Sequence, residues 1–346
     1  MAEEIEGIDV AGVTKWFEAN IAGVKPPLDF DLIAGGRSNL TFKVTDSAGQ
    51  QYVLRRPPKS HVLATAHDMS REFKIISALA PTPVPVAPAL GFTDDEGVNG
   101  APFYVMDYVD GLIVRDAKAA ERITPETRRV VGESLIDVLA EIHAVDPDAV
   151  GLGDLGRKDG YIERQLKRWY QQFQQSKMRE VPLMDEMYEF LKARIPEQGR
   201  ATIVHGDYRL DNTMLDPATG NVMAVLDWEI CTLGDPLADI GLLMVYWTDR
   251  DDVASGVGVG GGATTLEGFP RKAELRARYA DRTGVDVEEL DFYIAFGYWK
   301  LAAILDGVAT RYAKGAMGRD GAVYEGFAAS VVRLAETSHR FAEALR

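Results

Sequence analysis

Cysteine is almost absent from this chain of 346 residues. Its single cysteine, Cys231, excludes an internal disulfide and a zinc site built from cysteines. The five histidines are scattered without the spacing of metal ligands, which argues against a zinc centre. Long apolar runs are also lacking. Because no stretch of about 18 apolar residues occurs, we expect no transmembrane helix.

An excess of basic residues is missing as well, since the formal net charge is −15. Sequence-independent nucleic-acid binding needs basic surface to displace counterions, so no nucleic-acid partner is expected. A local basic pocket for a small anion remains compatible with this charge. The N-terminus, Met1–Glu6, is acidic and lacks the basic-then-apolar pattern of a signal peptide. We therefore expect a cytoplasmic protein without a membrane partner, and its oligomeric state stays open.

Strand signals dominate the first third of the sequence. Two alternating runs, Leu40–Thr45 and Gln51–Arg55, are separated by turn residues and predict a hairpin. A helix is expected from Asp68 to Leu79, before a proline-rich segment that cannot continue it. A second hairpin follows, with 94–100 as its turn and Phe103–Val109 as its outgoing strand.

Helical patterns dominate from about Arg115 onward. Thr124-Pro125 is a good helix start, because the hydroxyl can cap the helix and proline suits its first position. Further apolar repeats of helical spacing occupy roughly 161–175, 184–194, 271–281, 288–313 and 321–345. A β-rich part (1–110) followed by a helical part (111–346) predicts an α+β fold with two lobes.

The most informative stretch runs from Thr202 to Asp239 and contains Asp207, Asn212 and Asp227. Short strands are predicted at 213–215 and 222–226, joined by a turn rich in proline, glycine and asparagine. Folding this hairpin would bring Asn212 close to Asp227, with Asp207 in the loop that enters it. Carboxylate and amide oxygens suit Mg²⁺, a hard cation that proteins hold with few ligands.

The spacing H-x-D-x-x-x-x-N, followed by an aspartate after an apolar strand, is the arrangement of kinases. It predicts Asp207 as the catalytic base and Asn212 and Asp227 as ligands of Mg²⁺. Asp and Asn beside turns are more often caps, but their joint order favours the functional interpretation. Arg209 stands where protein kinases place a lysine, so we expect it to contact the γ-phosphate. The alternative is a solvated loop arginine.

The N-terminal part supplies the remaining elements of a nucleotide site in the expected order. They are a glycine-containing phosphate loop (Gly35, Gly36, Ser38, Asn39), a cation for the α/β-phosphates (Arg55), an acid to hold it (Glu72), and a hinge whose backbone reads adenine (Met106, Asp107, Tyr108). Each has a plainer interpretation, as a simple turn or a surface ion pair of little energy. Arg55 departs from the usual lysine, and Arg56 beside it leaves that choice open.

Together these motifs resemble the aminoglycoside phosphotransferase and choline kinase family, in a branch that includes the kinase-like domain fused to acyl-CoA dehydrogenases. The resemblance covers nearly the whole chain, and its last anchor is Gly234-Asp235-Pro236-x-x-Asp239. It implies a protein-kinase-like fold, ATP as donor, Mg²⁺ as cofactor and a small hydroxylated acceptor. It also implies that His205 and Asp239 support the loop of Asp207 rather than react. Gly206 stands where protein kinases carry arginine, so control by a phosphorylated activation loop is not expected.

Two alternatives to this enzyme remain open: an aminoglycoside-type antibiotic kinase, and a catalytically weak pseudokinase, which Arg55 would favour. Residues 271–346 contain 12 Lys+Arg and 11 Asp+Glu. The helices expected to bind the acceptor therefore lack the excess negative charge that would attract a polycation. An anionic or neutral acceptor such as a hydroxyacyl-CoA would suit them better. The cations and rings considered for it are Lys300, Arg311, Lys314, Tyr293 and Trp299, although core packing is the better interpretation of both rings. The glycine-rich run 255–262 is interpreted as a surface loop.

Overall fold

The computed structural model describes residues 5–34, 39–58, 68–254, 259, 261–314 and 321–345. The chain divides into two compact units: Met1–Gly111 with Met223–Glu229, and Leu112–Val222 with Ile230–Arg346. The sequence places all of 111–346 in the second lobe, whereas here 223–229 groups with the first unit. One reason is that the backbone N–H of Val225 donates to the carbonyl of Pro85 (2.8 Å).

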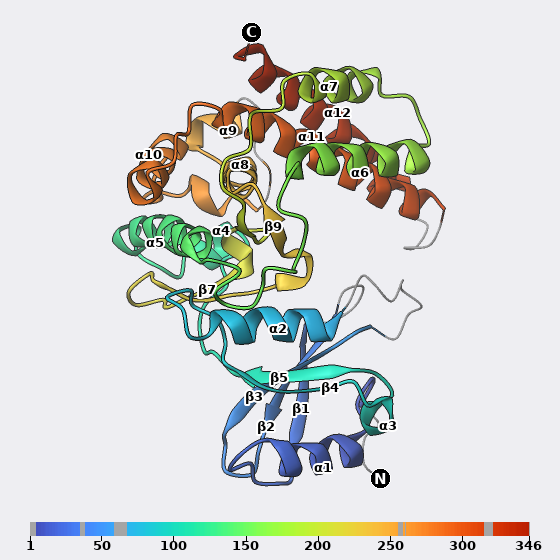
Figure 1. Cartoon of the computed structure of the whole chain (residues 1–346), viewed down its shortest axis with the longest axis vertical. Coiled ribbons are helices and arrows are strands. Elements are labelled where there is room, and N and C mark those ends of the chain that lie inside the picture. The colour runs from blue at the N-terminus through green and yellow to red at the C-terminus, as the bar shows by residue number, and fades with distance from the viewer. Residues whose placement is uncertain are drawn as a thin grey trace. The chain divides into compact units, whose positions relative to one another are not determined.

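A five-stranded antiparallel sheet in the order β1-β2-β3-β5-β4 forms the centre of the first unit (Figure 1). Its strands are β1 (Asp29–Ala34), β2 (Leu40–Thr45), β3 (Gln51–Arg56), β4 (Ala89–Thr93) and β5 (Phe103–Asp107). Three helices accompany them: α1 (Val10–Asn20), α2 (Met69–Leu79) and α3 (Glu96–Asn99). In Figure 1, α1 and α2 lie on opposite sides of this sheet.

The alternation of β3 decides which of its two arginines faces α2. Tyr52 and Leu54 belong to the apolar core that includes Phe17 of α1. Because side chains alternate along a strand, Arg55 points to the other face, where it meets α2. Arg56 returns to the α1 side and donates to the carbonyls of Gly7 and Asn99. The choice between the two arginines is thereby resolved in favour of Arg55 for pairing with α2.

Helices make up most of the second unit. They are α4 (Ala117–Ala120), α5 (Pro125–Ala144), α6 (Tyr161–Ser176), α7 (Pro182–Lys192), α8 (Leu237–Tyr246), α9 (Arg250–Ala254), α10 (Lys272–Thr283), α11 (Leu290–Ala313) and α12 (Gly321–Glu343). Two short sheets are also present, β6 (Thr202–Val204) with β9 (Thr232–Gly234), and β7 (Thr213–Leu215) with β8 (Val222–Val225), of which 223–225 group with the first unit.

The long helix α11 lies at the core of the second unit, packed against α6, α7, α8 and α12. By length and composition alone it could cross a membrane, but 83% of its most apolar window is buried inside the protein, as in the core helix of a soluble protein. Trp299 is completely buried, and its Nε1 donates to the carbonyl of Met184 (3.0 Å). Tyr293 is likewise buried. Both rings therefore pack the core, as expected.

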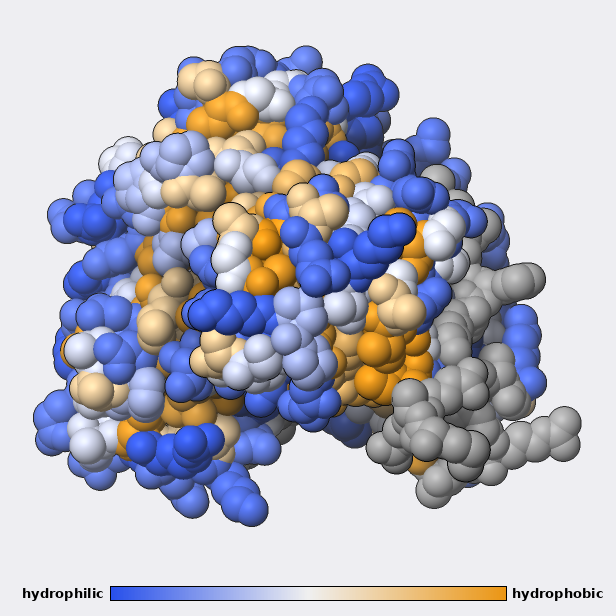
Figure 2. Space-filling model, turned by 90° about the horizontal axis from the view of Figure 1, so that it is seen from below, coloured by the Kyte–Doolittle hydropathy of each residue, from blue (hydrophilic) through white to orange (hydrophobic). Residues whose placement is uncertain are grey.

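Most predicted elements appear within a residue or two of their expected ends. The strand expected at Phe103–Val109 is shorter and ends at Asp107, and the turn of the second hairpin holds the short helix α3. On the face seen in Figure 2, hydrophobic residues occur in small patches among charged ones. The most exposed large hydrophobic residues of the first unit are Leu32 and Ile33 of β1.

Candidate active site

In the first unit, the buried guanidinium of Arg55 lies among carboxylates from separate segments. Its Nε is 3.2 Å from Oε2 of Glu72 on α2, and one terminal nitrogen is 2.5 Å from Oδ1 of Asp227. Glu229 is farther away, at 3.9 Å. We call Arg55, Glu72, Tyr104 and Asp227 the Arg55 cluster. The pairing of Arg55 with Glu72, expected from sequence, is confirmed, and it is not a surface pair.

Glu72 is buried and bonded to three other side chains. It is 2% exposed and accepts hydrogen bonds from the Tyr104 hydroxyl (2.9 Å) and from Asn39 Nδ2 (2.9 Å). Burial raises the pKa of Glu72, although Arg55 and these donors oppose the shift. Burial alone would lower the pKa of Arg55, but Tyr104, Glu72 and Asp227 together raise it. Arg55 therefore stays charged and fixed in position.

Asp227 has a backbone φ of 64°, and it is the single non-glycine residue with positive φ in the part of the chain that the structure describes. Side chains other than glycine, asparagine and aspartate seldom adopt this left-handed conformation, and strain of this kind clusters at functional sites. The carboxylate of Asp227 is one-third exposed, so it is accessible beside its contact with Arg55.

The structure describes only some of the other predicted nucleotide-binding residues. Gly35, Gly36 and Ser38 lie outside the described residues. Asn39 is buried and directed at Glu72. The N–H of Asp107, at the end of β5, is already donated to Pro88 (2.9 Å). Reading of adenine at Met106–Tyr108 would therefore depend on the remaining backbone groups.

In the second unit, Asp239 of α8 holds the start of a loop that we call the 205–212 loop. Its two carboxylate oxygens accept the backbone N–H groups of His205 (2.6 Å) and Gly206 (2.8 Å). His143 of α5 approaches the same carboxylate at 3.4 Å, and its other ring nitrogen contacts Tyr279. Burial alone would raise the pKa of Asp239, but these contacts lower it. The geometry agrees with the supporting role that the resemblance implies.

The carboxylate of Asp207 is gripped by two other residues of the 205–212 loop. Asn212 Nδ2 donates to the backbone carbonyl and to Oδ2 of Asp207, both at 2.8 Å. Because both partners are acceptors, the amide nitrogen must face them, which leaves the amide oxygen of Asn212 for another ligand. Arg209 Nε lies 3.3 Å from Oδ2 of Asp207, and its terminal nitrogen lies 2.9 Å from Asp211.

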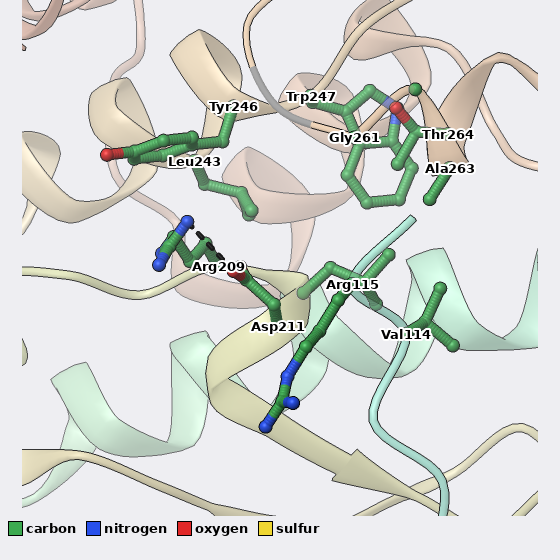
Figure 3. A pocket seen from close by; sticks show the side chains of 12 residues that line it. Val114, Arg115, Arg209, Asp211, Leu243, Tyr246, Trp247, Gly261, Ala263 and Thr264 are labelled. Atoms are coloured by element: carbon green, nitrogen blue, oxygen red, sulfur yellow. Dashed lines mark ion pairs between the residues drawn. The ribbon is translucent and has the colours of Figure 1, made fainter. Parts of the chain in front are cut away.

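A small cavity of about 50 Å³ adjoins Arg209 within the second unit (Figure 3). In Figure 3, the Arg209 and Arg115 guanidinium groups lie on different sides of Asp211. The Tyr246 ring lies 4.7 Å from the Arg209 guanidinium carbon. Trp247, a further wall residue, is fixed by donation from its Nε1 to the carbonyl of Pro270 (2.9 Å). The cavity thus combines aromatic and aliphatic walls with a cation that also contacts Asp207.

The donor set fits Mg²⁺ better than a transition metal. No group of three or more His, Cys, Asp or Glu that could hold a metal exists among the described residues. Magnesium commonly takes only one or two carboxylates from the protein and completes its octahedron with waters and substrate phosphates. The carboxylate of Asp227, in the first unit, and the amide oxygen of Asn212, in the second, are oxygen atoms of the type that Mg²⁺ prefers.

Several residues with a clear structural part were not predicted. Tyr104 holds Glu72, Glu229 lies beside Arg55, and His143 approaches Asp239. Lys300 was considered as an acceptor-binding cation, but it is buried in α11 and its ammonium donates to the Gly206 carbonyl (3.3 Å). That interpretation was wrong, because α11 is enclosed by other helices along most of its length, so its residue 300 is buried. Of these residues, Glu229 alone had a signal in the sequence, because it belongs to the run Asp227-Trp228-Glu229.

An antiparallel sheet in one unit and a helical second unit with this loop define an α+β, protein-kinase-like fold. Residues 29–293 match the model of the phosphotransferase enzyme family, and the chain belongs to this family.

Solved structures agree with this assignment. A Ralstonia eutropha protein named as a candidate aminoglycoside phosphotransferase is 33% identical, with a TM-score of 0.83 over 97% of this chain and 99% of that one. The GDP complex of aminoglycoside 2'-phosphotransferase-IIIa has a TM-score of 0.65 over 95% of this chain and 99% of that one. Its identity of 13% shows the shared fold alone.

Longer proteins contain a similar segment. Mouse acyl-CoA dehydrogenase family member 10 is 35% identical over 82% of this chain, and rat family member 11 is 35% identical over 81%. The chain covers only 27% and 36% of the length of these two relatives. The resemblance to the kinase-like domain fused to acyl-CoA dehydrogenases is thereby confirmed.

Proposed function

We propose that this chain transfers the γ-phosphoryl group of ATP to a hydroxyl group of a small molecule. Its family supports a small-molecule kinase, and complexes of structural relatives with GDP and with ADP support a nucleotide donor. One observation carries the proposal: Asn212 and Arg209 both contact the carboxylate of Asp207. The backbone of the same loop is hydrogen-bonded to Asp239.

In the proposed reaction, Asp207 accepts the proton of the acceptor hydroxyl while the acceptor oxygen forms a bond to the γ-phosphorus. The bond between that phosphorus and the β–γ bridging oxygen breaks, and ADP leaves with the electron pair. Asn212 and Asp227 would hold Mg²⁺, which when bound neutralises phosphate charge. Arg55, fixed by Glu72, would contact the α/β-phosphates.

Arg209 is proposed to bind the γ-phosphoryl group. Replacing Arg209 by alanine is expected to lower turnover by about ten-fold or more, the scale of a lost charge-assisted hydrogen bond. Initial rates of ADP formation at saturating Mg·ATP would measure this loss. Arg209→Lys is the matched control, because it keeps the cation and should retain more activity. Full activity of Arg209→Ala would identify a loop arginine that only bridges Asp207 and Asp211.

For the acceptor, we propose a molecule with an apolar part and an anionic or neutral character, such as a hydroxyacyl-CoA. Support comes from the aromatic and aliphatic walls of the cavity beside Arg209, and from the relatives named as acyl-CoA dehydrogenases. Trp299 and Lys300 are buried and contribute no surface for it, whereas the buried Tyr293 lines a different cavity of the second unit, with Asp235. Arg311 and Lys314 are exposed at the end of α11, and neither is among the residues that line this cavity.

A screen of hydroxylated metabolites for ADP release, with ATP and GTP as donors, tests the whole proposal. We expect turnover with hydroxyacyl-CoAs and little with kanamycin-type aminoglycosides, because the lining of this cavity does not concentrate negative charge. Efficient phosphorylation of the aminoglycoside alone would select the antibiotic-kinase alternative. Nucleotide binding without turnover on any acceptor, water included, would select the pseudokinase.

A further inference from the structure

Lys300, in the first half of α11, is a buried cation that belongs to no motif of the sequence. It is 8% exposed, and its ammonium donates to the carbonyl of Gly206 at 3.3 Å. The ring of Trp169 on α6 lies 5.8 Å from the same ammonium. Lysine is seldom buried unless it is paired, because its charge loses hydration.

The surroundings of Lys300 do not form an ordinary salt bridge. Asp207 and Asp239 attract its charge and Arg168 of α6 repels it, yet no ion pair within 4.0 Å is formed by Lys300 among the described residues. A methionine or leucine could fill this place in the core without losing hydration. The ammonium itself therefore calls for an explanation, and the Gly206 carbonyl is its hydrogen-bond acceptor.

That carbonyl belongs to the peptide that joins Gly206 to Asp207. The preceding N–H of Gly206 is held by Asp239 (2.8 Å), and the N–H of Asp207 is directed at His205 Nδ1 (3.3 Å). Gly206 has a φ of 86°, and a Cβ there would lie 3.1 Å from a carbon of Ile230. Lys300 thus holds the one remaining polar group of a peptide whose rotation would redirect the Asp207 side chain.

We propose that Lys300 is a positioning residue for Asp207, acting through the Gly206 carbonyl. This inference rests on the proposed role of Asp207 as the base. Asp239 fixes the loop from its N–H side and Lys300 from its carbonyl side, so the carboxylate of Asp207 is presented in one orientation. A protonated amine donates a stronger hydrogen bond than a neutral one, so the protonation of Lys300 matters for this grip.

The pH dependence of turnover distinguishes this role from simple packing, because a side chain that only fills space would not make turnover depend on the protonation of Lys300. Burial lowers the pKa of Lys300, partly opposed by Asp207 and Asp239, while the neighbouring Arg168 adds to the lowering. The ammonium is therefore present below this lowered pKa and lost as pH rises through it. The parent should lose turnover at a lower alkaline pH than an ordinary lysine would dictate, and Lys300→Arg should not, since arginine stays charged.

The experiment compares Lys300→Met, Lys300→Arg and Lys192→Met with the parent. Lys192 is an exposed lysine at the end of α7 and serves as the matched control. Rates of ADP formation from Mg·ATP, with water or a screened acceptor, are measured from neutral to alkaline pH. We expect about a ten-fold or larger loss of kcat in Lys300→Met with KM for ATP nearly unchanged, partial rescue in Lys300→Arg, and no change in Lys192→Met.

Hydrogen exchange of the segment Val204–Tyr208, expressed as protection relative to the intrinsic rate at each pH, is the second readout. Protection should fall in Lys300→Met and not in Lys192→Met. If the parent shows no turnover, the proposed function fails, and this loss of protection still tests whether Lys300 holds the loop through the Gly206 carbonyl. Parent-like kcat and protection in Lys300→Met overturn the inference. If Lys300→Met does not fold, the inference is overturned when turnover of the parent and of Lys300→Arg declines identically with rising pH.

Discussion

Replacing Asp207 by asparagine is expected to lower turnover by roughly 10²-fold or more, the scale of losing a general base. Nucleotide binding should change little, because an asparagine carbonyl can still accept the hydrogen bonds that Asn212 and Arg209 donate. The two quantities are kcat for ADP formation and the nucleotide Kd from calorimetry.

Asp211→Asn is the matched control for this substitution. It removes the same charge from the same loop, and Asp211 is likewise paired with Arg209, at 2.9 Å, but the amide of Asn212 donates to Asp207 and not to Asp211. Its loss of turnover should therefore be much smaller than that of Asp207→Asn. An Asp207→Asn protein with the turnover of the parent would remove Asp207 from the mechanism.

Replacing Asp227 by alanine should abolish the dependence of nucleotide binding on Mg²⁺, because the charged ligand proposed for the metal is lost. Titration of ATP with and without Mg²⁺ measures this dependence as a ratio of two Kd values. That ratio should fall close to one in the variant, and turnover should fall with it.

The backbone of Asp227 makes a second variant necessary. Alanine is strained at a φ of 64°, whereas asparagine tolerates this conformation, so Asp227→Asn separates the loss of charge from a backbone effect. Glu229→Gln is the control for the local field of Arg55, since Glu229 lies 3.9 Å from the same guanidinium. If both Asp227 variants bind Mg·ATP as the parent does, the ligand assignment is wrong.

The sequence could predict those parts of the site that depend on local order. Short alternating runs and turn residues located the strands at 40–45, 51–55 (which ends at Arg56 in the structure) and 213–215, and the spacing from Asp207 to Asn212 indicated their contact. The pairing of Arg55 with Glu72 followed from family order. The strand and loop signals are strong because they involve residues close together in the sequence, whereas Arg55 and Glu72 lie on separate elements, β3 and α2.

Contacts between distant segments could not be predicted in the same way. The carboxylate of Asp239 reaches the backbone of His205 across 34 positions, and Lys300 reaches Gly206 across 94. From the sequence, Lys300 is only a charged residue within an apolar helix. Its burial becomes visible only in the packing of α11. The α1 helix and strand β1 were not predicted, because short segments with mixed polarity give little periodic signal.

The packing of α11 and α12 has a practical consequence for trimming or transplanting this domain. The family match ends at residue 293, only a few residues into α11. Beyond that point, Ser338 of α12 donates to the carbonyl of Ala295 (2.7 Å), and Val331 and Ala335 are fully buried. A fragment cut at the match boundary would expose the apolar surfaces of α6 and α8 that α11 covers and of α7 that α12 covers, and would tend to aggregate. Any portable version should therefore extend through Glu343.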